Sequence, residues 1–171
     1  KRSRIKGDSI PLKDIHRDLN DLVSKRIVVV IDSCNSGELV DSVNSKGIYQ
    51  KVHGIAQNFL DIATEGRLIL TSSKGDEESL ELSEKDYQKL ERGLGNKGGL
   101  FTFHLLLALQ GEADKTDYGG NADNKITVDE LFSYVQRFVK SDSLNIAQKT
   151  QTPQKAGDLT GVIIELPKNQ D

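Results

Sequence analysis

The chain has 171 residues, and its 23 basic and 26 acidic side chains give a net charge of -3. This length suits a single domain spanning residues 1–171, and the charge balance provides no basic surface for nucleic acid. The sequence has no apolar run of about 18 residues that would cross a membrane, so we expect neither a nucleic acid nor a membrane as partner. One cysteine excludes an internal disulfide and suits a reducing compartment, which predicts a cytoplasmic protein.

The first half of the chain alternates between helical and strand patterns. Apolar spacings of three and four after Pro11 predict a helix, carried by Leu12, Ile15, Leu19 and Leu22. Residues 27–31 are five consecutive β-branched side chains, which predicts a strand covered on both faces. A helical stripe over residues 52–63 stops at Gly66, and residues 68–70 predict a second buried strand.

The second half begins with a polar stretch, residues 74–98, which predicts a long surface loop with a helical part near residues 84–91. Residues 100–109 are apolar nearly all round and predict a buried helix with Gly111 at its end. Residues 127–140 predict an amphipathic helix, and residues 161–166 a third strand. Alternating strands and helices favour an α/β fold with a mostly parallel sheet between helices.

The segment with chemical character comes directly after the first predicted strand, at Asp32-Ser33-Cys34-Asn35-Ser36-Gly37. Sites in open α/β sheets form at the carboxyl ends of strands, so a thiol here would lie beside a carboxylate and a flexible turn. Gly37 would let backbone N–H groups approach a reacting carbonyl. A free cysteine is also commonly a buried small hydrophobe. Local chemistry alone leaves both interpretations of Cys34 open.

The pattern Asp-Ser-Cys-x-Ser-Gly after a β-branched strand resembles the nucleophile motif of metacaspases and bacterial caspase-like cysteine peptidases. It departs from the Gln-Ala-Cys-x-Gly form of animal caspases. Further segments resemble the family in the expected order, and these are residues 9–15, 70–73, 99–102, 126–131 and 151–154. The cysteine motif is fairly specific, whereas each of the other segments is weak when taken alone.

The resemblance implies a caspase-hemoglobinase fold, which is a three-layer α/β/α sandwich whose N-terminal strands are absent from this chain. It implies a cysteine endopeptidase with Cys34 as nucleophile and the Cys34 backbone N–H in the oxyanion hole. Asp32 matches the acidic residue that selects arginine or lysine in the S1 pocket, although it also fits a strand-end cap. Ser72 and Ser73 would bind the substrate backbone or, equally, be turn residues. The expected substrate is a protein or peptide with a basic P1 residue.

A Cys-His dyad needs a histidine that this chain does not supply in the right order. The caspase histidine precedes the cysteine by about 50 residues, which lies before Lys1. His16 is expected to be solvated and His104 to be a core residue, while His53-Gly54 copies the family's dipeptide but follows the cysteine. We therefore expect the catalytic histidine on an upstream segment, separated by autoprocessing near the basic residues Lys1, Arg2 and Arg4.

A loop near the last predicted helix partly matches a calcium-binding pattern. Asn121, Asp123, Thr127 and Glu130 fall at positions three, five, nine and twelve of an EF-hand loop, but positions one and six do not fit. Thr127 and Glu130 also make a capping box, which accounts for them more simply. We expect no resident metal or cofactor, and calcium activation stays open.

Two other functions remain open from the sequence. Caspase-like domains also occur as non-catalytic scaffolds or regulatory binding modules, which would need no histidine. A nucleotide-binding α/β module fits poorly, because no glycine-rich phosphate loop follows any predicted strand.

Overall fold

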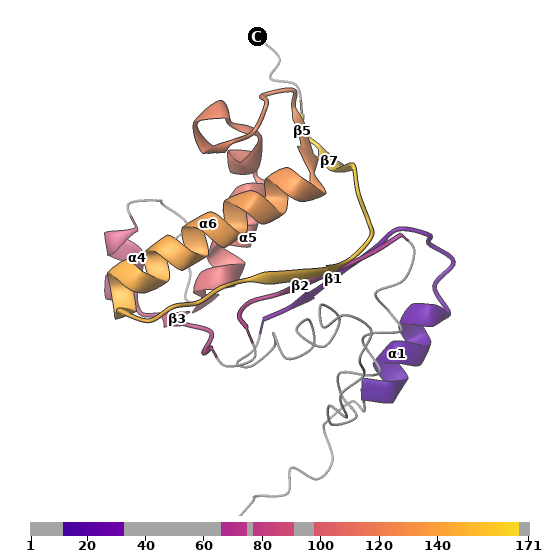
Figure 1. Ribbon diagram of the computed structural model, residues 1–171, viewed down its shortest axis with the longest axis horizontal. Helices are drawn as coiled ribbons and strands as arrows, with labels where there is room; N and C mark the ends of the chain where they lie inside the picture. Colours follow the sequence, from indigo (N-terminus) through magenta and orange to yellow (C-terminus); the bar gives the residue numbers. More distant parts are fainter. Residues whose placement is uncertain (1–11, 33–65, 75–76, 91–97, 168–171) are drawn as a thin grey trace, which may run out of the picture.

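The computed structural model describes residues 12–32, 66–74, 77–90 and 98–167. In these residues helices and short sheets are mixed (Figure 1). Helices α5 (Leu100–Leu109) and α6 (Val128–Ala147) lie over one side of a three-stranded sheet, and α1 (Leu12–Asn20) lies on the other side. The mixed α/β class is as predicted. The caspase-like sandwich and the single domain over residues 1–171 stay predictions, as does the helix over residues 52–63, which lies outside the described ranges.

The three-stranded sheet has the order β1 (Ile27–Ile31), β2 (Arg67–Thr71) and β6 (Gln154–Gly157). β1 and β2 are parallel, with Ile27 opposite Arg67 and Ile31 opposite Thr71. β6 runs antiparallel to β2, so the described sheet is mixed and not mostly parallel. The sequence did not reveal β6 because it carries a single aliphatic side chain, Ala156, and no alternating apolar pattern.

β1 is less covered than its apolar sequence predicts. Paired residues of neighbouring strands point to the same face of a sheet. Val28 and Val30 therefore lie on the same face as Leu68 and Leu70, their partners in β2. On that face, Leu68 and Leu70 belong to the core formed with α5 and α6. Yet Val28 and Val30 are 38% and 44% exposed, and among the described strands β1 has a neighbour on one side only. Within the described residues, the α5–α6 layer therefore covers the Leu68 and Leu70 face of β2 and leaves the same face of β1 partly exposed.

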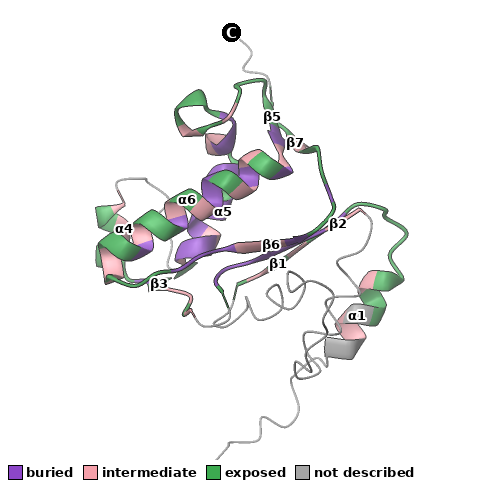
Figure 2. Cartoon of the chain, viewed as in Figure 1, coloured by how far each residue is buried: buried purple, intermediate pink, exposed green. Residues whose placement is uncertain are grey.

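The core lies between β2 and two helices, α5 (Leu100–Leu109) and α6 (Val128–Ala147), both of which carry many buried residues (Figure 2). α5 has the predicted bounds, and Gly111 follows it with a φ of 113°, a conformation that favours glycine. α6 begins at the predicted place but continues past residue 140, since Ser143 and Ile146 still contact the protein interior. Its innermost apolar side chains are Leu131, Tyr134, Val135 and Val139.

Two further pairs of strands lie outside the main sheet. β5 (Lys125–Thr127) pairs antiparallel with β7 (Val162–Glu165), so the predicted third strand exists but does not join β1 and β2. β3 (Glu81–Leu82) pairs antiparallel with β4 (Gly98–Gly99), and helix α4 (Glu84–Lys89) follows β3. The predicted helical part of the polar stretch is therefore confirmed. Two short 3₁₀ helices, Glu112–Asp114 and Thr116–Tyr118, connect α5 to β5.

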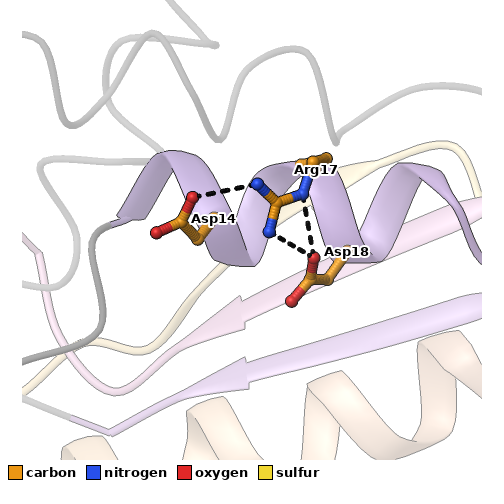
Figure 3. Close-up of polar contacts among 3 residues, drawn as sticks. All are labelled: Asp14, Arg17 and Asp18. Atoms are coloured by element: carbon orange, nitrogen blue, oxygen red, sulfur yellow. Dashed lines mark hydrogen bonds and ion pairs between the residues drawn. The ribbon is translucent and has the colours of Figure 1, made fainter.

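Helix α1 (Leu12–Asn20) carries a small charge cluster on its exposed surface. The Arg17 guanidinium lies between two carboxylates, 3.2 Å from Asp14 and 3.0 Å from Asp18, as Figure 3 shows. Asp18 and then Asp14 raise the pKa of Arg17 above its ordinary value. Because these groups face water, the pairs contribute little to stability. α1 connects to the sheet through Arg67, whose Nη1 donates to Asn20 Oδ1 at 2.7 Å.

Candidate active site

The candidate site lies where the parallel strands β1 and β2 end side by side. The Ser72 backbone N–H donates to the Ile31 carbonyl oxygen at 3.1 Å. The carboxyl ends of the two parallel strands therefore lie side by side, and so do the first residues after them. Asp32 follows β1, and Ser72 and Ser73 follow β2. Cys34 lies outside the described residues, two positions beyond Asp32. The structure thus brings three of the four predicted site residues to one edge.

The Asp32 side chain is exposed and contacts the segment that leads into α5. Thr102 Oγ1 donates to Asp32 Oδ2 at 2.5 Å. The backbone of Gly99 in β4 is so close that a Cβ there would lie 2.6 Å from the same oxygen. The carboxylate is therefore fixed by a neighbour distant in sequence and still faces solvent, which suits recognition of a cation.

Ser72 and Ser73 are fully buried, and their hydroxyls are used inside the protein. Ser72 Oγ is 2.5 Å from Ser79 Oγ, and Ser73 Oγ donates to the Glu77 carbonyl at 3.1 Å. These bonds organise the turn that follows β2. The role of both serines in substrate binding stays a prediction, and the observed contacts agree with the turn-residue interpretation.

A buried glutamine fixes the same turn to the C-terminal part of the chain. Gln151 Nε2 donates to the Ser72 carbonyl at 2.9 Å, and Gln151 Oε1 accepts from the Leu80 backbone N–H at 2.9 Å. Beside it, Thr152 Oγ1 donates to Glu77 Oε1 at 2.9 Å. Residues 151–154 attract notice in the sequence only for their family resemblance. A glutamine next to Thr-Pro carries no local sign of burial, so its role needed the structure.

The β4 segment beside Asp32 is fixed from its other side by α4 and α5. Tyr87 Oη donates to the Gly98 carbonyl at 3.3 Å, and the Tyr87 ring meets Phe103 edge-on at a centroid distance of 5.5 Å. Burial raises the pKa of Tyr87 above its ordinary value. The Leu100 backbone N–H donates to the Leu80 carbonyl at 2.8 Å.

The one histidine whose side chain the structure describes, His104, is turned toward α6. Its Nε2 lies 2.9 Å from Asp142 Oδ2, and its ring stacks on Phe138 at 5.8 Å. His104 is two residues after Thr102, so the two side chains project about 200° apart around α5. Since Thr102 contacts Asp32, His104 points away from the strand ends. The prediction that His104 is a core residue is confirmed, but the expectation that it is fully satisfied is not, because within the described structure its buried Nδ1 has no hydrogen-bond partner.

The loop with the partial calcium pattern is built on a buried carboxylate that the sequence analysis did not select. Asp114 accepts the backbone N–H groups of Asp123 and Asn124 at 3.1 and 2.9 Å. Thr127 and Glu130 form the predicted capping box, with Glu130 N donating to Thr127 Oγ1 at 3.2 Å. Within the described ranges, no three His, Cys, Asp or Glu side chains are grouped to hold a metal ion.

None of the helices in the described part of the chain combines the length and apolar character needed to cross a membrane. Comparison of the sequence with protein-family models and with curated proteins, and of the structure with solved structures, finds no match.

Proposed function

We propose that the chain is the nucleophile-bearing part of a caspase-like cysteine endopeptidase that cleaves after arginine or lysine. The observation that carries this proposal is the exposed, fixed carboxylate of Asp32 at the joint edge of β1 and β2, two residues before Cys34. A thiol and a solvent-facing carboxylate close to each other in the chain suit attack on a peptide whose basic side chain pairs with Asp32.

In the proposed reaction, the histidine takes the proton of the Cys34 thiol, and the thiolate forms a bond to the scissile carbonyl carbon. The oxyanion accepts a hydrogen bond from the Cys34 backbone N–H, and the C–N bond then breaks as the histidine protonates the leaving amine. Water hydrolyses the resulting thioester and restores the thiol.

The histidine is proposed to come from an upstream segment, since the described His104 contacts Asp142 within the helical layer. The sheet topology supports this, because β1 has a neighbour on one side only among the described strands, which leaves its other backbone edge for a further strand to pair with. Autoprocessing near Lys1, Arg2 and Arg4 would separate the two segments. Intact-mass analysis of the expressed precursor tests this step, and a precursor that never breaks near Lys1 would exclude it.

The decisive experiment is labelling of the full-length protein with an arginyl or lysyl acyloxymethyl ketone, followed by mass mapping. We expect an adduct on Cys34 that disappears in Cys34→Ala and weakens in Asp32→Ala. An isosteric ketone with citrulline at P1 is the control for charge recognition.

The second candidate is a non-catalytic scaffold of the same fold. It is favoured by Ser72 and Ser73, whose hydroxyls serve the turn itself. Absence of any directed adduct, with and without calcium, would make the scaffold the better interpretation.

A further inference from the structure

Asp32 owes its position to two residues near the start of α5. Thr102, in the first turn of that helix, donates its hydroxyl proton to Asp32 Oδ2 at 2.5 Å. Gly99, the residue before the helix, leaves the space that the same oxygen occupies, since a Cβ would approach it to 2.6 Å. One hydroxyl and one missing side chain thus define where the carboxylate lies.

We propose that Thr102 and Gly99 are positioning residues that hold Asp32 for pairing with the cationic P1 side chain of a substrate. This inference rests on the proposed peptidase function and adds the residues that set its charge selectivity. It assigns Thr102 no contact with the reacting atoms, because its effect passes through Asp32.

The hydrogen-bond pattern of the carboxylate supports this role. A hydroxyl bonded to an ionised carboxylate is among the stronger hydrogen bonds in proteins. It engages Oδ2, while no donor from the described residues is found on Oδ1. Asp32 is also exposed, so its carboxylate is accessible to a guanidinium or ammonium group. A carboxylate held in one orientation loses less conformational entropy when the cation binds.

The support behind Thr102 and Gly99 is rigid. Gly99 pairs with Glu81 across the β3–β4 ladder, and the neighbouring Gly98 carbonyl accepts from Tyr87. Thr102 is flanked in α5 by Phe101 and Phe103, both buried in the core. The donor therefore sits on a fixed frame, and the positioning does not depend on a mobile side chain.

The test uses Thr102→Val and Thr102→Ser in the full-length protein, with two peptides that differ only in arginine or citrulline at P1. Citrulline has nearly the shape of arginine without its charge, so the ratio of kcat/KM values measures charge recognition alone. We expect Thr102→Val to lower that ratio about tenfold, mainly by raising KM for the arginyl peptide. Thr102→Ser keeps the hydroxyl and should retain the ratio within about twofold.

A double-mutant cycle separates positioning from general damage to the protein. In an Asp32→Ala background, Thr102→Val should leave the arginine-to-citrulline ratio unchanged, because the carboxylate that it orients is gone. An equal loss for both peptides, or a ratio loss that persists without Asp32, would overturn the proposal and leave the peptidase function standing.

The two glycines of β4, Gly98 and Gly99, allow a matched pair of variants. Gly99→Ala places a methyl group against Asp32 and should lower the ratio at least as much as Thr102→Val. Among the described residues, a Cβ at position 98 would meet only Tyr87 Oη, at 3.6 Å, which is an ordinary contact, so Gly98→Ala should leave the ratio unchanged. Equal ratios in the two variants would count against positioning by Gly99. A wild-type protein that hydrolyses neither peptide and takes no ketone label would overturn both this inference and the proposed function.

Discussion

The helical layer and the strand-end edge of this protein use polar groups in opposite ways. Between α5 and α6, His104 is fully buried and is bound to a single carboxylate, Asp142. At the ends of β1 and β2, the Asp32 carboxylate is fixed by Thr102 yet faces solvent. The first arrangement gives rigidity, whereas the second leaves a charge free to act on another molecule.

The largest expected contrast between the two regions is in packing. Leu131→Ala empties a fully enclosed site in α6 and should lower the free energy of unfolding by about 2–5 kcal/mol. Val30→Ala, at a partly exposed position of β1, should lower the free energy of unfolding by less than about 1 kcal/mol. Urea denaturation of both variants measures the difference. Similar costs would mean that β1 is as well covered in solution as the helical layer.

The next effect concerns the buried pair of the helical layer. Asp142→Ala leaves His104 Nε2 without its partner, and within the described structure Nδ1 is already buried with none. We expect a loss of about 1–3 kcal/mol in unfolding free energy. In a His104→Phe background the same substitution should cost much less, because no buried nitrogen is stranded. An unchanged cost there would show that Asp142 acts through something other than His104.

A smaller effect is expected at the turn behind the candidate site. Gln151→Ala removes the acceptor of the Leu80 N–H and the donor to the Ser72 carbonyl. Hydrogen exchange at the Leu80 amide should accelerate by about tenfold or more. Gln110→Ala, at an exposed position after α5, is the control and should leave that amide unaffected. If the Leu80 amide keeps its protection from exchange in Gln151→Ala, the turn is stable without the hydrogen bonds of the buried Gln151 side chain.

The smallest effect is a pH dependence at the start of α4. The Asp86 carboxylate accepts from the Ser83 hydroxyl at 2.5 Å and from the Ser83 backbone, and these bonds lower the pKa of Asp86 below its ordinary 3.8. A lowered folded-state pKa means that the stabilisation is complete above 3.8 and is lost as pH falls through the folded value.

Ser83→Ala should therefore raise the pKa of Asp86 toward 3.8, as measured by NMR titration. The pKa of Glu78, which is lowered by Lys149, should not change. A Glu78 shift of the same size would point to a rearrangement of the whole segment.

The sequence predicted the elements whose pattern is local. Residues 27–31 and 68–70 are apolar enough to mark β1 and β2, and the Thr127–Glu130 capping box marks the start of α6. β6 was missed because its pairing with β2, rather than its composition, makes it a strand. Thr102 and Gln151 were not selected because their partners, Asp32 and Ser72, lie far away in the chain.

The exposure of β1 was predicted wrongly for a related reason. Five β-branched residues indicate a strand, but whether both faces are covered depends on how far the helices extend across the sheet. Buried side chains of α5 and α6 form one core with Leu68 and Leu70 of β2. Val28 and Val30 of β1 lie outside this core and are partly exposed. The sequence thus predicted the kind of element and not its surroundings.

The antiparallel pairing of Leu68 with Gly157 has a consequence for how the protein is made. On the ribosome, β1 and β2 emerge long before β6, so the central strand has an unpaired side while the intervening residues are synthesised. Exposed strand edges of this kind favour association between nascent chains. The sheet is completed only when residues 154–157 have left the exit tunnel, so this protein closes its sheet late, after the helical layer has been synthesised.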